Sequence, residues 1–187
     1  LVAAVLLSIG SGCLMPQEVG AATYYWYKTK NEWVTDYTKA TPTGNIATLS
    51  DNMPNDSLRT GFSKENDVEV SKDRITVSDS AEVFSVYGGY SSNSSAIENE
   101  VTINGGSITY MVAGGFGRLE ANNNKVTING GTIRAIVGGN GNGGSATGNS
   151  VIINGGTIGE AVDGELYGVI AGGIGTGDSA TSNTVTI

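Results

Sequence analysis

The stretch VTINGGTI, residues 126–133, occurs three times in nearly the same form. It reads VTINGGSI at residues 101–108 and VIINGGTI at 151–158, so successive copies start 25 residues apart. A degenerate copy begins at Ile75, 26 residues before Val101, and a last VTI begins at Val185, 34 residues after Val151. Repetition at such a period is the first guide to the fold.

Each copy has the same internal order. A β-branched triplet such as Val126, Thr127 and Ile128 comes first, then Asn-Gly-Gly, then a second apolar run that ends in Gly-Gly. In a strand, the Val and Ile point to one side and the Thr to the other. Asn and Gly turn the chain because both tolerate positive φ. Triplets too short for a stable sheet can stack on copies of themselves at about 4.8 Å.

We therefore predict an all-β fold: a right-handed parallel β-helix (β-solenoid) of about 25-residue coils with an N-terminal cap. Leucine-rich repeats and collagen are excluded, because neither the leucine offsets nor glycine at every third residue is present. Two sets of side chains should stack along the coils. A hydrogen-bonded ladder is expected from Asn104, Asn129 and Asn154. The core after the turn should be filled by Ile108, Ile133 and Ile158.

The turn glycines should differ from those of the exposed loops. We expect Gly130 or Gly131 to adopt a backbone angle that a β-branched residue reaches only with strain. We expect Gly143 and Gly144 to tolerate replacement better, because they lie in a loop that can adjust.

The copy at Ile75 is atypical and suggests a boundary. Aligned without gaps, it has Ser78, Asp79 and Ser80 in place of Asn-Gly-Gly, and Glu82 in place of the core Ile. Terminal repeats of solenoids are commonly degenerate because they contact a cap. We therefore divide the chain into a signal peptide at 1–22, a capping segment and loop at 23–73, and repeats at 74–187 that are cut off inside a repeat. Residues 41–64 are rich in Thr, Asn, Ser, Asp and Pro, which predicts mostly loop, with a short strand at 45–50.

The N-terminal residues have the pattern of a secretory signal peptide that is truncated at its start. An apolar run, LVAAVLLSIG, is followed by the small residues VGAA, and cleavage after Ala21 or Ala22 fits this pattern. Cys13 lies in GSGC, which partly resembles a lipobox, so lipidation at this cysteine stays open. Cleavage after VGAA would leave a mature chain without cysteine.

Composition excludes several classes of function. The net charge is −8 and the pI about 4.4, which disfavours binding to nucleic acid. The chain has no histidine, so Ser-His-Asp catalysis and histidine-based metal sites are excluded.

Aromatic residues gather in one short span before the repeats. They are Tyr24, Tyr25, Trp26, Tyr27, Trp33 and Tyr37, and the KTKNE between them predicts a turn between two strands. Two interpretations stay open: the rings cap an open end of the solenoid, or they form a platform on which glycans stack.

Three further groups of residues could carry chemistry. GGIGTGD at 172–178 is similar to the calcium-binding nonapeptide G-G-x-G-x-D, but Asp178 is one residue late and the motif occurs once. Nine residues are inserted in the fourth copy, and they bring acids and a tyrosine that could contact a ligand: Glu160, Asp163, Glu165 and Tyr167. The repeats offer four basic side chains without a facing aspartate cluster: Arg74, Arg118, Lys125 and Arg134. We identify no catalytic, cofactor-binding or metal-binding residue, and expect no enzymatic activity and no cofactor.

A signal peptide followed by cysteine-free coils of the form VTINGGxI…GG…G…SATxNxVTI resembles bacterial autotransporter-type adhesins. The resemblance covers roughly residues 75–187 and the signal. It implies a secreted Gram-negative surface protein with a parallel β-helix passenger. A C-terminal β-barrel in the outer membrane would lie outside this fragment. No residue matches a catalytic motif of the enzymatic members, so none is carried over.

These patterns lead to two hypotheses. The first is a cell-surface passenger segment that acts as a structural and adhesive rod and displays loops for attachment. Its partners would be protein or glycan ligands on host or neighbouring cells. The alternative is a secreted polysaccharide-active β-helix enzyme, a lyase or a hydrolase.

Overall fold

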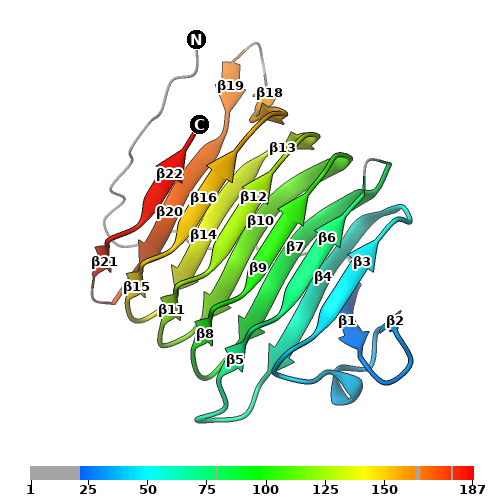
Figure 1. Cartoon of the computed structure of the whole chain (residues 1–187), viewed down its shortest axis with the longest axis vertical. Helices are drawn as coiled ribbons and strands as arrows, with labels where there is room; N and C mark the ends of the chain where they lie inside the picture. Colours follow the sequence, from blue (N-terminus) through cyan, green and yellow to red (C-terminus); the bar gives the residue numbers. More distant parts are fainter. Residues whose placement is uncertain (1–21, 79, 163–164, 178) are drawn as a thin grey trace.

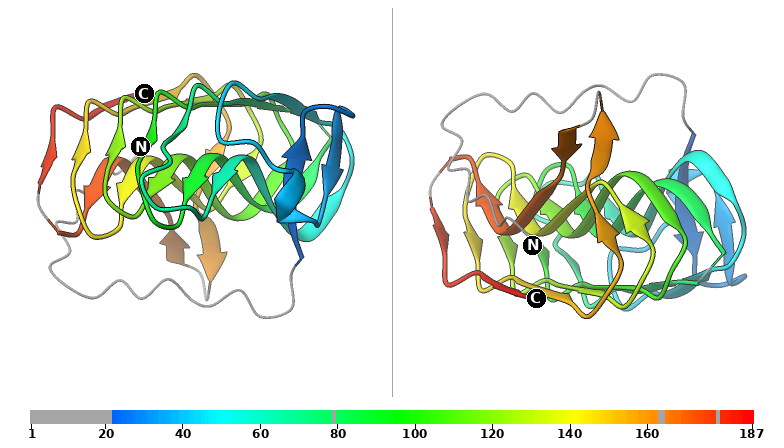
Figure 2. Two further views of the ribbon diagram at one scale, coloured as in Figure 1. Left: turned by 90° about the horizontal axis from the view of Figure 1, so that it is seen from below. Right: turned by 90° about the horizontal axis from the view of Figure 1, so that it is seen from above.

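The chain folds as a parallel β-solenoid, which confirms the all-β prediction. The computed structural model describes residues 22–78, 80–162, 165–177 and 179–187, with the backbone alone for residues 160–162 and 165–167. Successive coils stack on one another along the molecule (Figure 1). Views from below and above show the N-terminal strands at one end of this stack and the C-terminal strands at the other (Figure 2).

The β-branched triplets form one side of the solenoid as a six-stranded sheet. In spatial order its described strands are β22 (Thr184–Thr186), β16 (Ser150–Ile153), β12 (Lys125–Ile128), β9 (Glu100–Ile103), β6 (Arg74–Val77) and β3 (Ile46–Leu49). Equivalent residues lie directly opposite each other, so Val126 pairs with both Val101 and Val151. Val126 and Ile128 are fully buried whereas Thr127 is half-buried, as the alternation predicts.

The Asn-Gly-Gly turn holds its shape through positive φ and through a side-chain ladder. Gly131 has φ +93°, and a Cβ added there would lie 2.8 Å from the carbonyl oxygen of Gly106. The Nδ2 of Asn129 donates to Asn104 at 2.9 Å, and that of Asn154 donates to Asn129 at 2.8 Å. The predicted asparagine ladder is therefore confirmed.

The second side is a sheet that contains the longest strands that the structure describes, β4 (Met53–Ser63) and β10 (Ser107–Gly117), and it continues into the N-terminal hairpin. Its strands are β17 (Thr157–Ile158), β13 (Thr132–Ile133), β10, β7 (Glu82–Ser91), β4, β1 (Thr23–Tyr27) and β2 (Glu32–Val34), with β14 (Ala135–Gly141) beside β10 and β20 (Val169–Gly175) beside β14. The β1–β2 pair is antiparallel, which confirms the turn predicted from KTKNE. A 3-10 helix, η1 (Tyr37–Lys39), follows β2.

The third side consists of two-residue strands and carries a second ladder of asparagines, which is buried except at Asn183. The strands are β5 (Val70–Ser71), β8 (Ala96–Ile97), β11 (Ala121–Asn122), β15 (Ala146–Thr147) and β21 (Ala180–Thr181). Both the backbone N–H and the Nδ2 of Asn99 donate to the Oδ1 of Asn124 at 3.0 Å. Asn124 makes the same two bonds to Asn149, and Asn149 makes them to Asn183.

This buried ladder explains the second glycine of the Gly-Gly pair that ends each second apolar run. A Cβ added at Gly115 would lie 2.5 Å from the Oδ1 of Asn124. A Cβ at Gly139 would collide with the side chain of Asn149 in the same way. The side-chain amide thus occupies the space that any residue larger than glycine would need.

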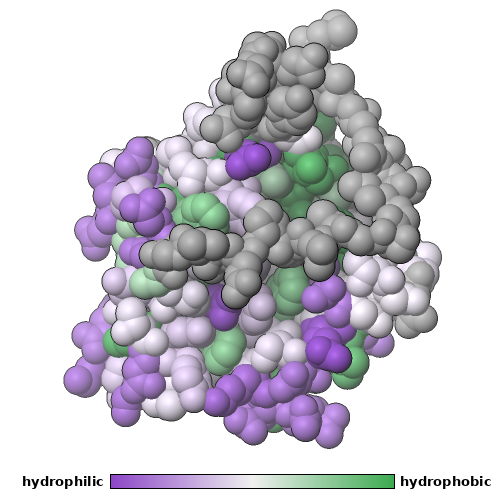
Figure 3. Space-filling view, turned by 180° about the vertical axis from the view of Figure 1, so that it is seen from behind, coloured by the Kyte–Doolittle hydropathy of each residue, from purple (hydrophilic) through white to green (hydrophobic). Residues whose placement is uncertain are grey.

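The main core runs through the centre of the stack. It holds inward side chains of the first two sides, among them Leu58, Val86, Val112, Ile128 and Ile136. Ile108 and Ile133 are buried as predicted, and Ile158 is half-buried and packs against the same cluster. On the outer face of the second sheet, Tyr87, Met111, Ala113, Phe116 and Val137 form a separate apolar cluster. Apolar residues also appear on the face opposite that of Figure 1 (Figure 3).

The loop predicted for residues 41–64 is wrong over its second half, because β4 is an 11-residue strand. β4 pairs in parallel with β7, with Gly61 opposite Gly89, while β3 pairs with β6 and β5 with β8. Residues 46–71 therefore form a coil of the solenoid, ahead of the boundary expected at residue 74. The short strand expected at residues 45–50 is present as β3.

The ungapped alignment of the atypical copy is also corrected. Val83, not Glu82, lies opposite Ile108 and is fully buried, while Glu82 lies opposite Ser107 and is exposed. The register shifts between Ile108 and Met111, which restores the alignment of the rest of the strand. The core position of this coil is thus occupied by an apolar residue.

The glycines of the exposed loop are less tolerant than expected. Gly143 has φ +126°, and a Cβ at Gly144 would collide with the carbonyl oxygen of Leu119 in the neighbouring coil. Because the loops of successive coils stack closely, Gly143 and Gly144 are constrained nearly as strongly as the glycines of the Asn-Gly-Gly turn.

The insertion in the fourth copy forms a small antiparallel hairpin. Its strands are β18 (Glu160–Val162) and β19 (Glu165–Tyr167). The hairpin projects away from the body of the solenoid (Figure 2).

Candidate functional site

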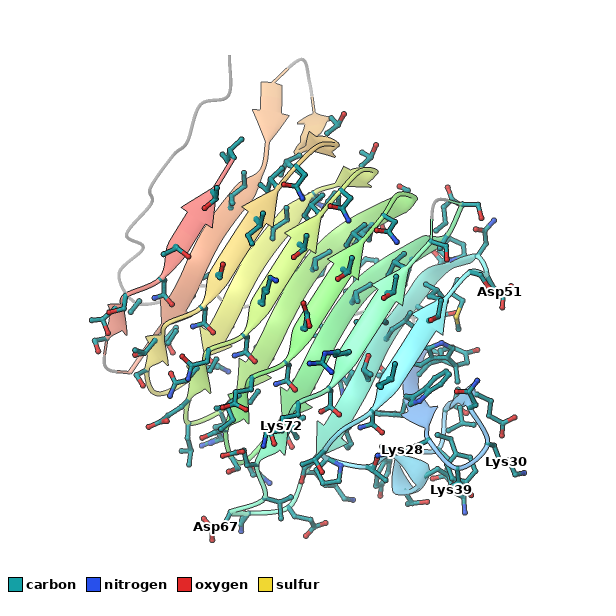
Figure 4. The ribbon with its side chains drawn as sticks, viewed as in Figure 1. Lys28, Lys30, Lys39, Asp51, Asp67 and Lys72 are labelled. Carbon is teal, nitrogen blue, oxygen red and sulfur yellow. The ribbon has the colours of Figure 1, made fainter. Side chains whose placement is uncertain are left out.

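A cavity of about 670 Å³ opens at the N-terminal end of the solenoid, where the β1–β2 hairpin meets β3 and the turn into β4. Its aromatic lining consists of Tyr24, Trp26 and Trp33. The rest of the lining comprises Asn31, Glu32, Ile46, Thr48, Asp51 and Met53. In Figure 4, Asp51 lies beyond the end of β3, and Lys30 lies on the turn between β1 and β2, at the same end of the molecule.

The aromatic rings are positioned by the pairing of β1 with β2. Trp26 and Trp33 are cross-strand partners, and their ring centroids lie 5.1 Å apart in an edge-on arrangement. Trp26 is only 4% exposed and belongs to the main core, whereas Tyr24 and Trp33 are half-buried and pack against that core. Trp26 therefore anchors the hairpin, and Tyr24 and Trp33 keep accessible ring surface toward the cavity.

Trp33 carries an unsatisfied donor. Its Nε1 is buried and has no hydrogen-bond partner in the described part of the protein. A buried polar group without a partner costs about 1–3 kcal/mol, and such groups are uncommon in folded proteins. The indole therefore has no hydrogen bond that fixes the orientation of its ring.

The charged groups of the lining are both acidic. Glu32 and Asp51 are exposed, and none of the lining residues is Lys or Arg. Lys28 and Lys30 lie nearby on the β1–β2 turn without lining the cavity (Figure 4). Rings, carboxylates, an amide and a hydroxyl together suit reversible binding of a small polar ligand that has apolar faces.

The aromatic span found in the sequence is divided between two places. Tyr25 does not line the cavity and instead contacts Phe62 and Tyr37 edge-on, at centroid distances of 4.7 and 6.4 Å. Arg59 lies over the ring of Tyr90, 3.7 Å from its centroid, within the same group. The Nζ of Lys64 donates to the hydroxyl of Tyr37 at 2.6 Å, and this bond raises the pKa of Lys64.

One buried carboxyl group lies elsewhere, in the asparagine ladder. Asp73 is fully buried, and its Oδ1 accepts from the backbone N–H of Asn45 at 2.8 Å and from the Nδ2 of Asn45 at 2.6 Å. Burial raises the pKa of Asp73 to about 7, although these hydrogen bonds and the charge of Lys28 lower it. Its Oδ2 has no described partner. The sequence patterns did not identify Asp73 or this ladder. The signal in the sequence was the asparagine that precedes the β-branched triplet of the later repeats, as Asn124 does.

The glycine-rich loop considered for calcium shows hydrogen bonding between coils. The Oγ1 of Thr176 accepts from the N–H of Gly143 at 2.8 Å, and Asp178 lies outside the described residues. Within the residues that the structure describes, no group of three or more His, Cys, Asp or Glu side chains could hold a metal ion.

The inserted residues are placed by backbone only. Glu160 lies opposite Tyr167 in the β18–β19 hairpin, and Val162 lies opposite Glu165. Asp163 lies outside the described residues. Ligand contact by these acids therefore stays a prediction.

The basic side chains of the repeats are partly engaged with acids. Arg74 and Lys125 flank Glu100 on adjacent strands, at N–O distances of 3.0 and 3.5 Å. These groups are largely exposed, so the network contributes little to stability. Arg118 and Arg134 are not part of this network.

Comparison with known protein families, curated proteins and solved structures gives no match. In the part of the chain that the structure describes, no helix has the length and hydrophobicity of a membrane-spanning segment. The solenoid is compatible with the β-helix passenger that the repeats resemble.

Proposed function

We propose that this chain is a passenger segment of a Gram-negative surface protein, where it acts as a stiff structural and adhesive rod. Export by the N-terminal signal and anchoring by an outer-membrane barrel encoded outside the segment belong to this proposal. The observation that supports it best is the in-register stacking of the coils, which builds a continuous core from the cap to β16. Such a stack can hold loops and end surfaces away from a cell.

The proposal assigns attachment, not catalysis, to this segment. The cavity at the cap and the projecting β18–β19 hairpin are the two features that depart from the regular stack. Insertions and ends are where solenoids commonly carry their binding surfaces. Partners would be protein or glycan ligands on host or neighbouring cells.

Attachment is tested with beads that carry the full chain, layered on epithelial cells and on bacterial cells and then washed under flow. Wild-type beads should be retained. Ile133→Asp should abolish retention because it buries a charge in the core, whereas Thr132→Asp should not, because Thr132 is exposed and adjacent. Wild-type retention no better than that of blank beads would contradict adhesion.

The enzymatic alternative is tested on the same preparation. The full chain is incubated with a panel of neutral and acidic polysaccharides, and newly formed reducing ends are measured. We expect no release above that of the Ile133→Asp protein. Release by wild type alone would replace the rod with the polysaccharide-active enzyme.

A further inference from the structure

We propose that the cavity between the N-terminal hairpin and the first coil binds a neutral carbohydrate of one or two sugar units. This inference rests on the proposed attachment function and gives it a ligand class and a place. The volume of about 670 Å³ is within the range of small-molecule sites, about 300–1,000 Å³.

The aromatic rings of the lining provide a platform for a sugar. Sugars have apolar C–H faces that pack on aromatic rings, and Tyr24 and Trp33 present half-buried rings to the cavity. Trp26 is part of the core and contacts the ring of Trp33 edge-on, with ring centroids 5.1 Å apart. A ring held in this way loses little side-chain entropy when a ligand stacks on it.

The polar side chains of the lining match the hydroxyl groups of a sugar. Sugar hydroxyls both donate and accept, and they match the carboxylates of Glu32 and Asp51, which accept, and the amide of Asn31, which does both. The Nε1 of Trp33 is buried without a described partner, so the indole N–H is not one of the accessible donors of the lining.

The charge of the lining selects among polar ligands. Because Glu32 and Asp51 are the charged groups of the lining, a uronic or sialic acid would meet repulsion. A cationic ligand would gain attraction from the acids, but an aromatic cage needs several exposed ring faces around the cation. Here Trp26 is buried, which leaves a one-sided platform that suits a flat sugar face better than a cage.

The site carries its own reporter. The chain contains two tryptophans, and both line the cavity. Tryptophan fluorescence of the full-length protein is therefore titrated with glucose, galactose, mannose, N-acetylglucosamine, cellobiose and lactose, and in parallel with glucuronate and choline. We expect saturable changes with at least one neutral sugar at a Kd on the order of 1 mM, and at least tenfold weaker binding of glucuronate.

Variants separate the contributions. Trp33→Ala should weaken sugar binding at least tenfold, and Trp33→Phe, which keeps a ring and removes the N–H, by a smaller factor. Both keep Trp26 as reporter. Phe84→Ala is the matched aromatic control, because Phe84 does not line the cavity and instead stacks on Tyr110, with ring centroids 4.9 Å apart. The affinity of this variant for the sugar should stay within twofold of that of the wild type. Circular dichroism of each variant checks that the strands are retained.

Three results would overturn the inference: no saturable change with any neutral sugar, equal affinity in Trp33→Ala, or saturation by choline alone. The outcome is independent of the bead experiment. Bead retention without sugar binding would reject the sugar site and leave the rod in place. Sugar binding without bead retention would keep the site and reject the adhesive function.

Discussion

At the residue scale, the buried asparagine ladder contains one exception, Asp73. Asn99, Asn124 and Asn149 each donate their Nδ2 to the Oδ1 of the next rung. Asp73 has an oxygen in place of that donor, and this Oδ2 is buried without a described partner. A protonated carboxyl could donate as the amide does, which agrees with the raised pKa of Asp73.

Asp73→Asn should therefore stabilise the protein at high pH. The pKa of Asp73 rises from 3.8 in the unfolded chain to about 7 in the fold. The stability that its protonated carboxyl contributes is therefore fully present below about pH 4 and is lost as the pH rises through about 7. This difference of about 3 between the two pKa values corresponds to at most about 4 kcal/mol in the free energy of unfolding. Chemical denaturation at pH 4.5 and 8 should show a larger advantage for the variant at pH 8. An advantage that does not change with pH would contradict this assignment.

The two ladders also show what single residues reveal in a sequence. The outer ladder was predictable because Asn104, Asn129 and Asn154 stand in an obvious repeated turn. The inner ladder was not, because Asn99 and Asn124 look like ordinary loop residues before a strand. Their role depends on glycines of the preceding strand, such as Gly115 beside Asn124, that come to lie next to them only when the chain turns within the coil.

At the scale of elements, the strand pattern predicted most of the repeats but missed β4. Pro54, Asn55 and Asp56 at its start favour a loop locally. Tertiary pairing outweighs this preference, since Leu58 fills the core and Gly61 lies opposite Gly89 of β7. A degenerate Gly-Gly, Thr60-Gly61, was the signal in the sequence.

The core role of β13 can be measured with a neighbouring pair of variants. Ile133→Ala removes a fully buried side chain and should lower the free energy of unfolding by about 2–5 kcal/mol. Thr132→Ala, at the exposed position beside it, should change the free energy by no more than about 0.5 kcal/mol. Denaturation of both proteins in urea tests the contrast, and equal losses would argue against an inward Ile133.

The glycine-rich sequence at residues 172–178 permits a prediction about calcium. Its motif occurs once, whereas calcium-binding glycine-rich solenoids draw ligands from adjacent turns. Thermal unfolding with millimolar calcium and with chelator should therefore give superimposable curves. A marked rise of the Tm in calcium would point to a metal site at this loop.

At the scale of the whole molecule, the repeat period was sufficient to predict a stack of parallel strands. It was not sufficient to locate the candidate site. Tyr24 and Tyr25 are adjacent in the sequence, yet strand alternation sends the first toward the cavity and the second toward Phe62. The cavity also needs Thr48 and Asp51 from the following coil, and no local pattern joins them to the aromatic hairpin.

The central claim, that successive copies stack in register, is tested most directly by cysteine cross-linking. Thr102 and Thr127 are paired on neighbouring coils, whereas Thr102 and Ile152 are two coils apart. In a Cys13→Ser background, which removes the single native cysteine, Thr102→Cys with Thr127→Cys should form a disulfide under mild oxidation. Thr102→Cys with Ile152→Cys should not, because strands two coils apart are separated by about 10 Å. Equal cross-linking of both pairs, or of neither, would contradict the stacked solenoid.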